Sequence, residues 1–338
     1  MTKPLLDQTP DHRSLKVLRD AGVISPASFW AGIRQMNDPQ EWARWAARLC
    51  MVLGSALVLA AVVYFFAFNW DALERMQKLG LLQALTLGAL GAGQWVGFRR
   101  LGGQLLLMAA AIFVGVSFAV FGQVYQTGAD AFGFFGIWAL CILPWVLAGA
   151  FAPLWVLWFV LVNLTVWLFW NQVGQFNSLL HYSYICIPLT VLNGAGLLLR
   201  ERLATRYEWL RGRWLRPLFL LGALTPLLIP ALDLIVDSSA GGGYAMFVGS
   251  VIWMLCLGVT YLYFTRCQFD STALCIVLGN AALYLITAIG RMLEEADLFD
   301  DGAGFFLMAL VIVGVTALLV WWLRELSQRH GSTAGSLQ

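Results

Sequence analysis

Residues 131–199 decide the fold of this protein: AFGFFGIWALCILPWVLAGAFAPLWVLWFVLVNLTVWLFWNQVGQFNSLLHYSYICIPLTVLNGAGLLL. The stretch contains no Asp, Glu, Lys or Arg. A soluble domain, in which roughly 25% of residues are charged, does not bury so long an uncharged segment in one piece. A hydrocarbon core of ~30 Å needs ~20 apolar residues for each helical crossing. The stretch therefore predicts several consecutive membrane-spanning helices.

Apolar runs of the same kind continue on both sides of this stretch. We expect ten spans, at residues 48–68, 79–98, 104–125, 132–149, 153–171, 182–199, 217–236, 244–264, 272–290 and 303–323. They predict an all-α fold, a polytopic transmembrane helical bundle over residues 47–323. A short cytoplasmic helical extension at residues 1–46 precedes it, and a disordered cytoplasmic tail at residues 324–338 follows. The weakest boundary lies between the fourth and fifth spans, where only Ala152 and Pro153 mark a turn.

The basic residues fall on alternate sides of the predicted spans. When the N-terminus is placed in the cytoplasm, only Arg75, Lys78 and Arg291 of the 21 basic residues lie in outer segments. The positive-inside rule therefore predicts that both termini are cytoplasmic. The first apolar run follows a charged segment, which is not the pattern of a cleavable signal peptide. The net charge of +2 describes loops, so we expect the lipid bilayer as a partner and no nucleic acid.

The inner loop at residues 200–216 carries six arginines beside Tyr207, Trp209 and Trp214. Basic residues next to aromatic ones suit an anionic lipid surface. The same residues also suit a topology determinant with interfacial anchors, and both explanations stay open.

The sequence offers no pattern for a cofactor or a metal ion. None of the six cysteines has C-x-x-C spacing, and only His181 of the three histidines lies near the predicted outer surface. Phosphate-binding, zinc-protease and nucleophile-elbow motifs are absent from the sequence. We therefore expect no cofactor and no metal site, and no catalytic residues are predicted.

Residues 1–46 predict a pair of short helices followed by the start of the first span. A helix around residues 14–21 is expected to stop at Gly22, and Ser25-Pro26 supplies a cap and a first-turn proline for the next. Residues 38–41 (DPQE) predict a capping box. An apolar face is shared by Phe29, Trp30, Ile33 and Met36. Three explanations of this face stay open: it packs inside a helical hairpin, it binds a membrane or cytoplasmic protein partner, or it lies on the membrane.

Polar side chains within the spans are the candidate functional residues, because such groups are costly in hydrocarbon. The richest stretch is residues 121–130 (FGQVYQTGAD), at the outer end of the third span. Small residues recur every four positions below it, at Ala111, Gly115 and Ala119, and this stripe predicts that Gln123 points at a neighbouring helix. Gly128 offers a helix break whose backbone groups could line a cavity.

Three further polar groups lie toward the predicted outer side. Asn69 and Asp71 follow the first span, and Asp233 follows two prolines in the seventh. A polar stripe in the ninth span ends in Arg291, for which Asp233, Asp71 or Asp130 is a plausible partner. The candidate cavity or polar-network residues are Asn69, Asp71, Gln123, Tyr125, Gln126, Asp130, Asp233, Asn280, Tyr284, Thr287 and Arg291. Hydrogen bonding between helices is the alternative explanation for each stripe, and it is the one we expect for Asn163, Asn171 and Asn193.

Several of these segments resemble one family. FFAFNWD at residues 65–71, FGQVYQTGAD at residues 121–130 and WALCILPW at residues 138–145 look like the bacterial predicted membrane proteins grouped as domain of unknown function 2157. The start of that family is similar to GVIS at residues 22–25, and the resemblance covers roughly residues 10–150. It implies a multi-pass protein of the bacterial inner membrane and carries no activity to transfer.

The preferred function is transport or handling of a small molecule or lipid through an outward-facing polar cavity. The alternative is a non-catalytic scaffold or sensor that docks a partner through the N-terminal helices. An intramembrane enzyme acting on an envelope lipid, with Asp71, Asp130 or Asp233 as acid or base, is the least favoured. A cavity that joins Gln123, Asp233 and Asn280 would support transport, whereas separate dry helix contacts would contradict it.

Overall fold

The computed structural model describes residues 12–36, 39–68, 73–125, 128, 130–173, 183–212, 214–236, 243–299 and 302–335. Within these residues every regular element is a helix. The elements are α1 (His12–Asp20), α2 (Pro26–Met36), α3 (Pro39–Phe68), α4 (Arg75–Val96), α5 (Leu101–Tyr125), α6 (Ala131–Gly149), α7 (Ala152–Val173), α8 (Ser183–Leu203), the 3-10 helix η3 (Glu208–Arg211), α9 (Leu215–Val236), α10 (Gly243–Leu262), the π-helical turn η4 (Tyr263–Cys267), α11 (Ser271–Glu295) and α12 (Ala303–Gly335).

Ten of these helices, α3 to α12, are long and apolar enough to cross a membrane, as expected. The all-α polytopic bundle is therefore confirmed. The weak boundary between the fourth and fifth spans is a true helix break: α6 ends at Gly149, and Ala150 adopts the left-handed conformation with φ 43°. A left-handed residue cannot continue a right-handed helix, so the chain reverses between α6 and α7.

The C-terminal tail is helical, and the expectation of disorder after residue 323 is wrong up to Gly335. The apolar run ends near residue 323, but nothing beyond it breaks a helix, because the segment contains no proline. Arg329 also pairs with Glu325 one turn earlier, at 2.9 Å between Nε and Oε1. Such pairs at i and i+4 stabilise an exposed helix modestly.

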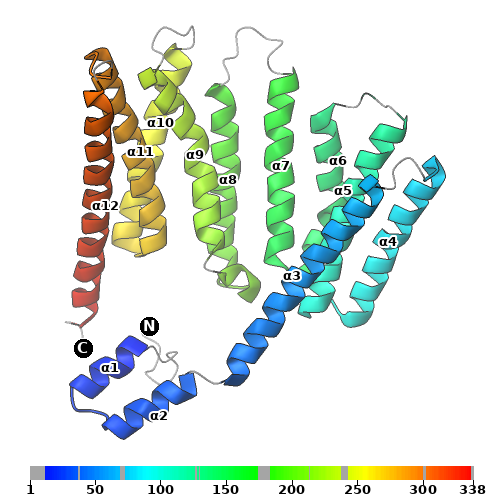
Figure 1. The fold of residues 1–338 in the computed structure, drawn as a ribbon, viewed down its shortest axis with the longest axis horizontal. Helices are drawn as coiled ribbons and strands as arrows, with labels where there is room; N and C mark the ends of the chain where they lie inside the picture. The colour runs from blue at the N-terminus through cyan, green and yellow to red at the C-terminus, as the bar shows by residue number, and fades with distance from the viewer. Residues whose placement is uncertain are drawn as a thin grey trace.

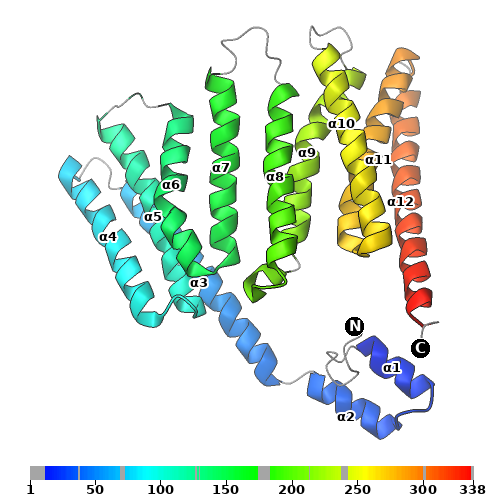
Figure 2. The same ribbon diagram turned by 180° about the vertical axis from the view of Figure 1, so that it is seen from behind.

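The ten long helices form two groups that meet between α7 and α8 (Figures 1 and 2). In the first group α4 packs on α5 and α6 packs on α7, around a core that includes Leu107, Ile142 and Leu154. In the second group α9 is central and contacts α8, α10 and α11, and α12 packs on α11. We call the end of the bundle that carries α1, α2, the C-terminal end of α12 and the α8–α9 connection the basal end, and the opposite end the apical end.

A tight contact between α5 and α6 uses the small residues that recur along α5. The indole Nε1 of Trp138 on α6 donates a hydrogen bond to the carbonyl of Ala111, at 2.8 Å. The same ring lies directly over Gly115, where a Cβ would collide with it. The stripe therefore permits close helix approach, as the sequence indicates, at Ala111 and Gly115.

The N-terminal helices form a hairpin at the basal end. Gly22 makes the turn with φ 71°, and the Ser25 hydroxyl oxygen accepts the backbone N–H of Ser28, which caps α2 as expected. Phe29 is buried under the guanidinium of Arg19, at 4.6 Å from the ring centroid. Trp30, by contrast, is exposed. The capping box expected at residues 38–41 begins outside the described residues.

Candidate functional site: a crevice between the two helix groups

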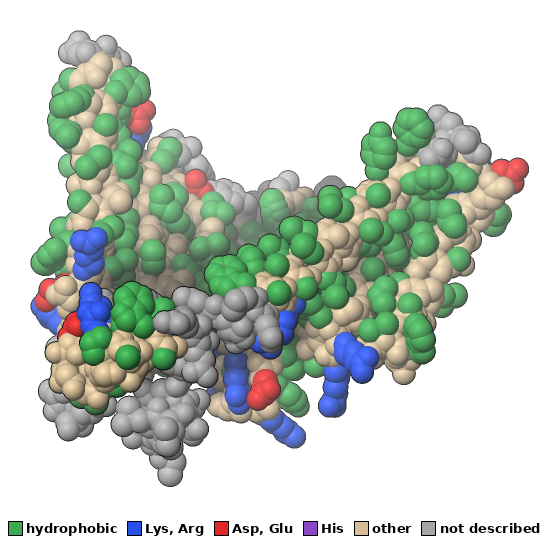
Figure 3. Space-filling view, turned by 60° about the horizontal axis from the view of Figure 1, so that its bottom comes forward, with side chains coloured by type: hydrophobic (Ala, Val, Ile, Leu, Met, Phe, Trp, Pro, Cys, Tyr) green, Lys and Arg blue, Asp and Glu red, His purple; other side chains and the backbone are tan. Residues whose placement is uncertain are grey.

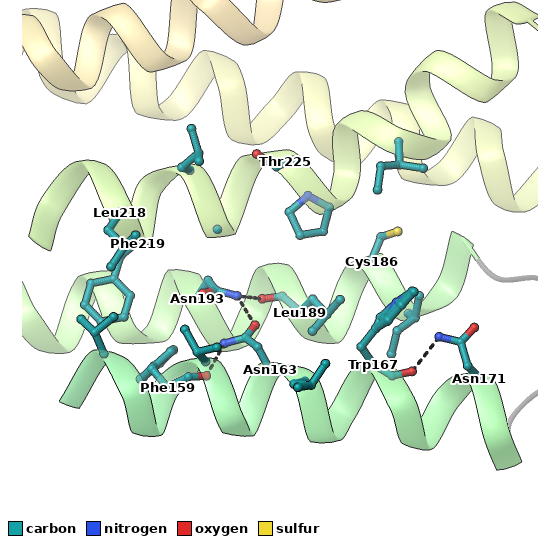
Figure 4. A pocket seen from close by; sticks show the side chains of 18 residues that line it. Phe159, Asn163, Trp167, Asn171, Cys186, Leu189, Asn193, Leu218, Phe219 and Thr225 are labelled. Atoms are coloured by element: carbon teal, nitrogen blue, oxygen red, sulfur yellow. Dashed lines mark hydrogen bonds between the residues drawn. The ribbon is translucent and has the colours of Figure 1, made fainter. Parts of the chain in front are cut away.

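A crevice of about 740 Å³ lies where α7 meets α8 and α9 (Figure 4). Its size falls within the range of small-molecule sites, roughly 300–1,000 Å³. The walls are mostly aliphatic and aromatic side chains, with a few amides between them. Val156 lines the basal end of the crevice and Asn171 the apical end. At a rise of 1.5 Å per residue, these two positions on α7 lie ~22 Å apart, which is most of a hydrocarbon core of ~30 Å.

The crevice is open along one side. Side chains on its rim are well exposed on both α7 and α9: Val160, Trp167, Leu218, Leu221 and Ile229. In a membrane these apolar side chains would face lipid, since both helices are long and apolar enough to cross it. The open side of the crevice therefore lies on the apolar surface of these two helices.

Two amides join α7 to α8 near the middle of the crevice (Figure 4). The Nδ2 of Asn193 donates to Oδ1 of Asn163 at 2.6 Å and to the carbonyl of Leu189 at 2.8 Å. Asn163 in turn donates to the carbonyl of Phe159 at 2.8 Å. Asn193 is only 7% exposed, so its amide bridges the two helix groups in a largely desolvated position.

The α9 wall is shaped to approach this amide pair. A Cβ at Gly222 would lie 2.6 Å from Oδ1 of Asn193, so glycine permits the close approach of α8 and α9. Pro226 has no backbone N–H, so the Gly222 carbonyl cannot receive its usual helical hydrogen bond from that residue. Both Gly222 and Pro226 line the crevice. The middle of this apolar space therefore carries hydrogen-bond acceptors.

The basal end of the crevice is closed by aromatic packing. The Phe159 and Phe219 rings meet edge to face, with centroids 4.8 Å apart. Trp155 at the start of α7 stacks on Trp209 of η3, with centroids 5.8 Å apart. Leu210 and Phe219 belong to one buried cluster, against which Phe159 and Trp209 pack. The α8–α9 connection therefore forms the floor beneath the crevice.

The predicted polar cavity is not formed by the residues that we expected. Three of them, Asn69, Asp71 and Gln126, lie outside the described residues. Gln123, Tyr125 and Asp130 are exposed at the apical ends of α5 and α6. The contact of the small-residue stripe with α6 lies ~12 Å below Gln123, at Gly115, where the Trp138 ring packs.

The polar residues of α11 make contacts within the helix bundle. Asn280 is buried and donates from Nδ2 to the carbonyl of Ile276, at 3.0 Å, while its Oδ1 has no hydrogen-bond partner in the described chain. Thr287 bonds to the carbonyl of Leu283. Tyr284 packs its ring against Trp253, with centroids 5.0 Å apart. Tyr284 thus contacts a neighbouring helix, whereas these hydrogen bonds of Asn280 and Thr287 stay within α11.

Arg291 pairs with glutamates of its own helix. Among the described residues it forms no ion pair with Asp130 or Asp233, and Asp71 lies outside the described residues. Its guanidinium lies 3.0 Å from Glu294 and 3.2 Å from Glu295. These residues follow at i+3 and i+4, the spacing at which helical side chains meet. Asp233 is half-buried on α9. None of the described candidates from the sequence lines the crevice.

The amides that line the crevice were not among the candidate functional residues predicted from the sequence. A signal was present, because Asn163, Trp167 and Asn171 recur every four residues and so share one face of α7. Asn163 and Asn193 do bond a neighbouring helix, as expected, whereas Asn171 bonds the carbonyl of Trp167 on its own helix at 2.9 Å. The sequence did not show that the joined helices also leave a space between them.

The arginine-rich loop below the crevice divides into internal and exposed members. Arg200 donates to the carbonyls of Leu210 and Gly212, both at 3.1 Å, and so holds the α8–α9 connection. Arg216 makes a two-pronged contact with Glu201, at 2.8 Å for both bonds, and a third bond to Asp270 at 2.6 Å. Arg202, Arg206 and Arg211 are exposed, and Arg213 lies outside the described residues.

Asp270 is a junction between this network and α11. Its Oδ1 caps the helix by accepting the backbone N–H groups of Thr272 and Ala273, at 3.0 and 3.2 Å. Burial raises the pKa of Asp270, but the hydrogen bond from Arg216 and those from the two backbone groups outweigh it, so the pKa lies below its ordinary value. The carboxylate therefore stays charged and ties α9 to the start of α11.

Part of the chain, from the N-terminal helices to the start of α7, matches a protein family. Residues 16–155 match the family described as predicted membrane protein (DUF2157). This confirms the resemblance inferred from residues 65–71 and 121–145. The match ends at Trp155, at the start of α7, so most of the crevice lies beyond it. Comparisons with curated proteins and with solved structures find no match to the chain.

Proposed function

We propose that this multi-span membrane protein handles a lipid or another apolar small molecule, which enters the crevice between α7, α8 and α9 sideways from the bilayer. One observation carries the proposal: a space of about 740 Å³ runs ~22 Å along α7 with an exposed apolar rim. A soluble polar substrate fits such walls poorly. The outward-facing polar cavity of the sequence-based hypothesis is replaced by an apolar one that opens to the side.

Binding of one lipid in the crevice, in preference to the other lipids of the bilayer, depends on how well that lipid packs against the walls. Lipid tails are as apolar as the crevice walls, so the hydrophobic effect does not distinguish the two environments. Selection then depends on packing against rigid rings such as Phe159 and Trp167, and on hydrogen bonds at the amide pair. A ligand with a polar group beside Asn193 would gain such a bond, which an unfunctionalised chain cannot make.

The charge distribution supports an orientation for this activity. The basal end carries the α8–α9 connection with its described arginines and both described chain ends (Figure 1), and Figure 3 shows several Lys and Arg side chains on this face. By the positive-inside rule we infer that the basal end faces the cytoplasm, and we propose the bacterial inner membrane as the location. The crevice then spans from the cytoplasmic leaflet toward the outer one.

Photo-crosslinking tests the proposed function directly. The full chain, in lipid nanodiscs, is irradiated with a phospholipid that carries a diazirine on its acyl chain, and the modified residues are mapped by mass spectrometry. We expect the modifications to concentrate on the crevice faces of α7, α8 and α9. An even spread over all exposed apolar helix faces would overturn the proposal.

A matched pair of substitutions sharpens the test. Val160→Trp fills the crevice from its rim, whereas Val251→Trp places the same ring at a comparably exposed valine on α10. We expect crevice modification to fall toward background in the first variant and to persist in the second. Equal yields in the two variants would contradict a bound lipid.

A further inference from the structure

We propose that the crevice takes an anionic phospholipid from the basal leaflet, with its acyl chain between α7 and α9 and its phosphate at the exposed arginines Arg202, Arg206 and Arg211. The inference rests on the proposed function and names the ligand class of the same site. Three observations support it: the arginine loop is continuous with the crevice, its exposed charge is positive, and the other end of the crevice offers no cation.

The arginine loop and the crevice share one packed floor. Trp209 and Leu210 of η3 belong to the cluster that contains Val156, Phe159 and Phe219, and all three of the latter line the crevice. Arg211 directly follows Leu210 and is exposed. A chain lying in the crevice therefore reaches its basal end beside the arginines.

The internal and exposed arginines have different tasks. Arg200 and Arg216 are largely buried and are occupied by Glu201, Asp270 and backbone carbonyls. Arg202, Arg206 and Arg211 are exposed. Glu208 offsets one charge at most, at 3.9 Å from the Arg211 guanidinium. The exposed surface of the loop is thus net positive, which attracts anionic headgroups.

Aromatic side chains place this loop at headgroup depth. Trp214 is exposed one helical turn before Leu218, which lies on the crevice rim. Tyr207 is also exposed and lies under the guanidinium of Arg206, at 5.7 Å from the ring centroid. Tryptophan and tyrosine are enriched where a membrane meets water. The open side of the crevice therefore reaches headgroup depth at its basal end, beside Leu218, where a lipid phosphate would lie.

The apical mouth lacks the complementary charge. Asn171 and Ile185 line that end, and the sequence holds no lysine or arginine between residues 131 and 199. The segment that follows α9 adds Asp237 and no basic residue before α10. An anionic headgroup is therefore favoured only at the basal end, which assigns the lipid to one leaflet.

The test compares two lipids with identical chains. The full-length protein is placed in nanodiscs that contain either a diazirine-labelled phosphatidylglycerol or the equivalent phosphatidylcholine, at the same mole fraction. After irradiation, the crosslinking yield at crevice residues is measured for each lipid. We expect the wild-type protein to prefer phosphatidylglycerol. In the variant Arg202→Gln/Arg206→Gln, which keeps the bonds of Arg211 to the Ala204 and Thr205 carbonyls, the preference should fall by about fivefold or more.

A second loop supplies the control. Arg99 and Arg100 are exposed between α4 and α5 at the basal end, away from the crevice. Arg99→Gln/Arg100→Gln removes the same charge, and we expect it to leave the preference unchanged. High salt should weaken the wild-type preference, because exposed charges are screened.

The outcomes separate this inference from the proposed function. Equal crevice yields for both lipids in the wild-type protein, or an undiminished preference in Arg202→Gln/Arg206→Gln, would overturn the headgroup assignment while the crevice stays a lipid site. Loss of crevice labelling with both lipids would instead overturn the proposed function.

Discussion

Replacing Arg216 with methionine should destabilise the bundle more than the same change at the exposed Arg206 of this loop. Arg216 is 13% exposed and makes three charge-assisted bonds, two to Glu201 on α8 and one to Asp270 at the start of α11. Methionine keeps most of the length of the side chain but removes all three bonds. Asp270, 22% exposed, would then lose its charged partner, whereas Glu201, also 22% exposed, would keep only its ion pair with Arg200.

The magnitude follows from these burials. Removing one member of a buried ion pair costs about 3–5 kcal/mol, because the remaining charge is left uncompensated. Glu201 keeps its ion pair with Arg200, and both carboxylates keep some contact with water, so we expect the lower end, about 3 kcal/mol. Arg206→Met is the matched control, since Arg206 is exposed and only lies over the Tyr207 ring. An exposed charge of this kind contributes roughly 0–1 kcal/mol.

The assay is unfolding in mixed detergent micelles with rising SDS, followed by tryptophan fluorescence. The free energies of unfolding of the wild type, Arg216→Met and Arg206→Met are compared at one pH and salt concentration. Arg216→Lys provides a third variant, which keeps the charge but cannot make the two-pronged contact and should fall between the other two. If Arg216→Met is no less stable than Arg206→Met, the network does not hold α8, α9 and α11 together.

Three further outcomes follow from the structure. The pKa of Asp270 is lowered from 3.8 on folding. Its stabilising effect is therefore fully present above about pH 5 and is lost as the pH falls through the folded pKa. In Asp270→Asn the free energy of unfolding should accordingly fall less steeply as the pH is lowered. Gly115→Ala should lower the free energy of unfolding by about 1–3 kcal/mol, because the new methyl group forces the Trp138 ring aside. Gly88 has open space around it, so Gly88→Ala should stabilise α4 by a few tenths to 1 kcal/mol. Thermal unfolding of the two variants compares these effects. A double-mutant cycle of Asn163→Ala and Asn193→Ala should give a coupling energy of about 0.6–1.7 kcal/mol, and independent effects would show that the amide bond does not join the helix groups.

The sequence by itself determined the ten spans and the helix pair before them. A hydrocarbon core demands long apolar runs, so the runs are visible without a structure, and α6 and α7 separate where Ala152-Pro153 indicates. Local signals also located the α1–α2 turn, because Gly22 adopts a positive φ and Ser25 caps the next helix within one turn. The sequence did not predict that α12 continues beyond residue 323, because polar residues mark the end of a span but not the end of a helix.

Only the tertiary structure decided which polar groups meet. Asn163 and Asn193 bond because α7 and α8 are neighbours, and Arg216 reaches Asp270 across 54 residues of chain. In lipid every face of a spanning helix is apolar, so periodicity does not reveal which face turns inward. Among the described candidates, Asn280, Thr287 and Arg291 bond within α11, and Gln123, Tyr125 and Asp130 are exposed. The crevice instead lies beside the amides that join the two helix groups.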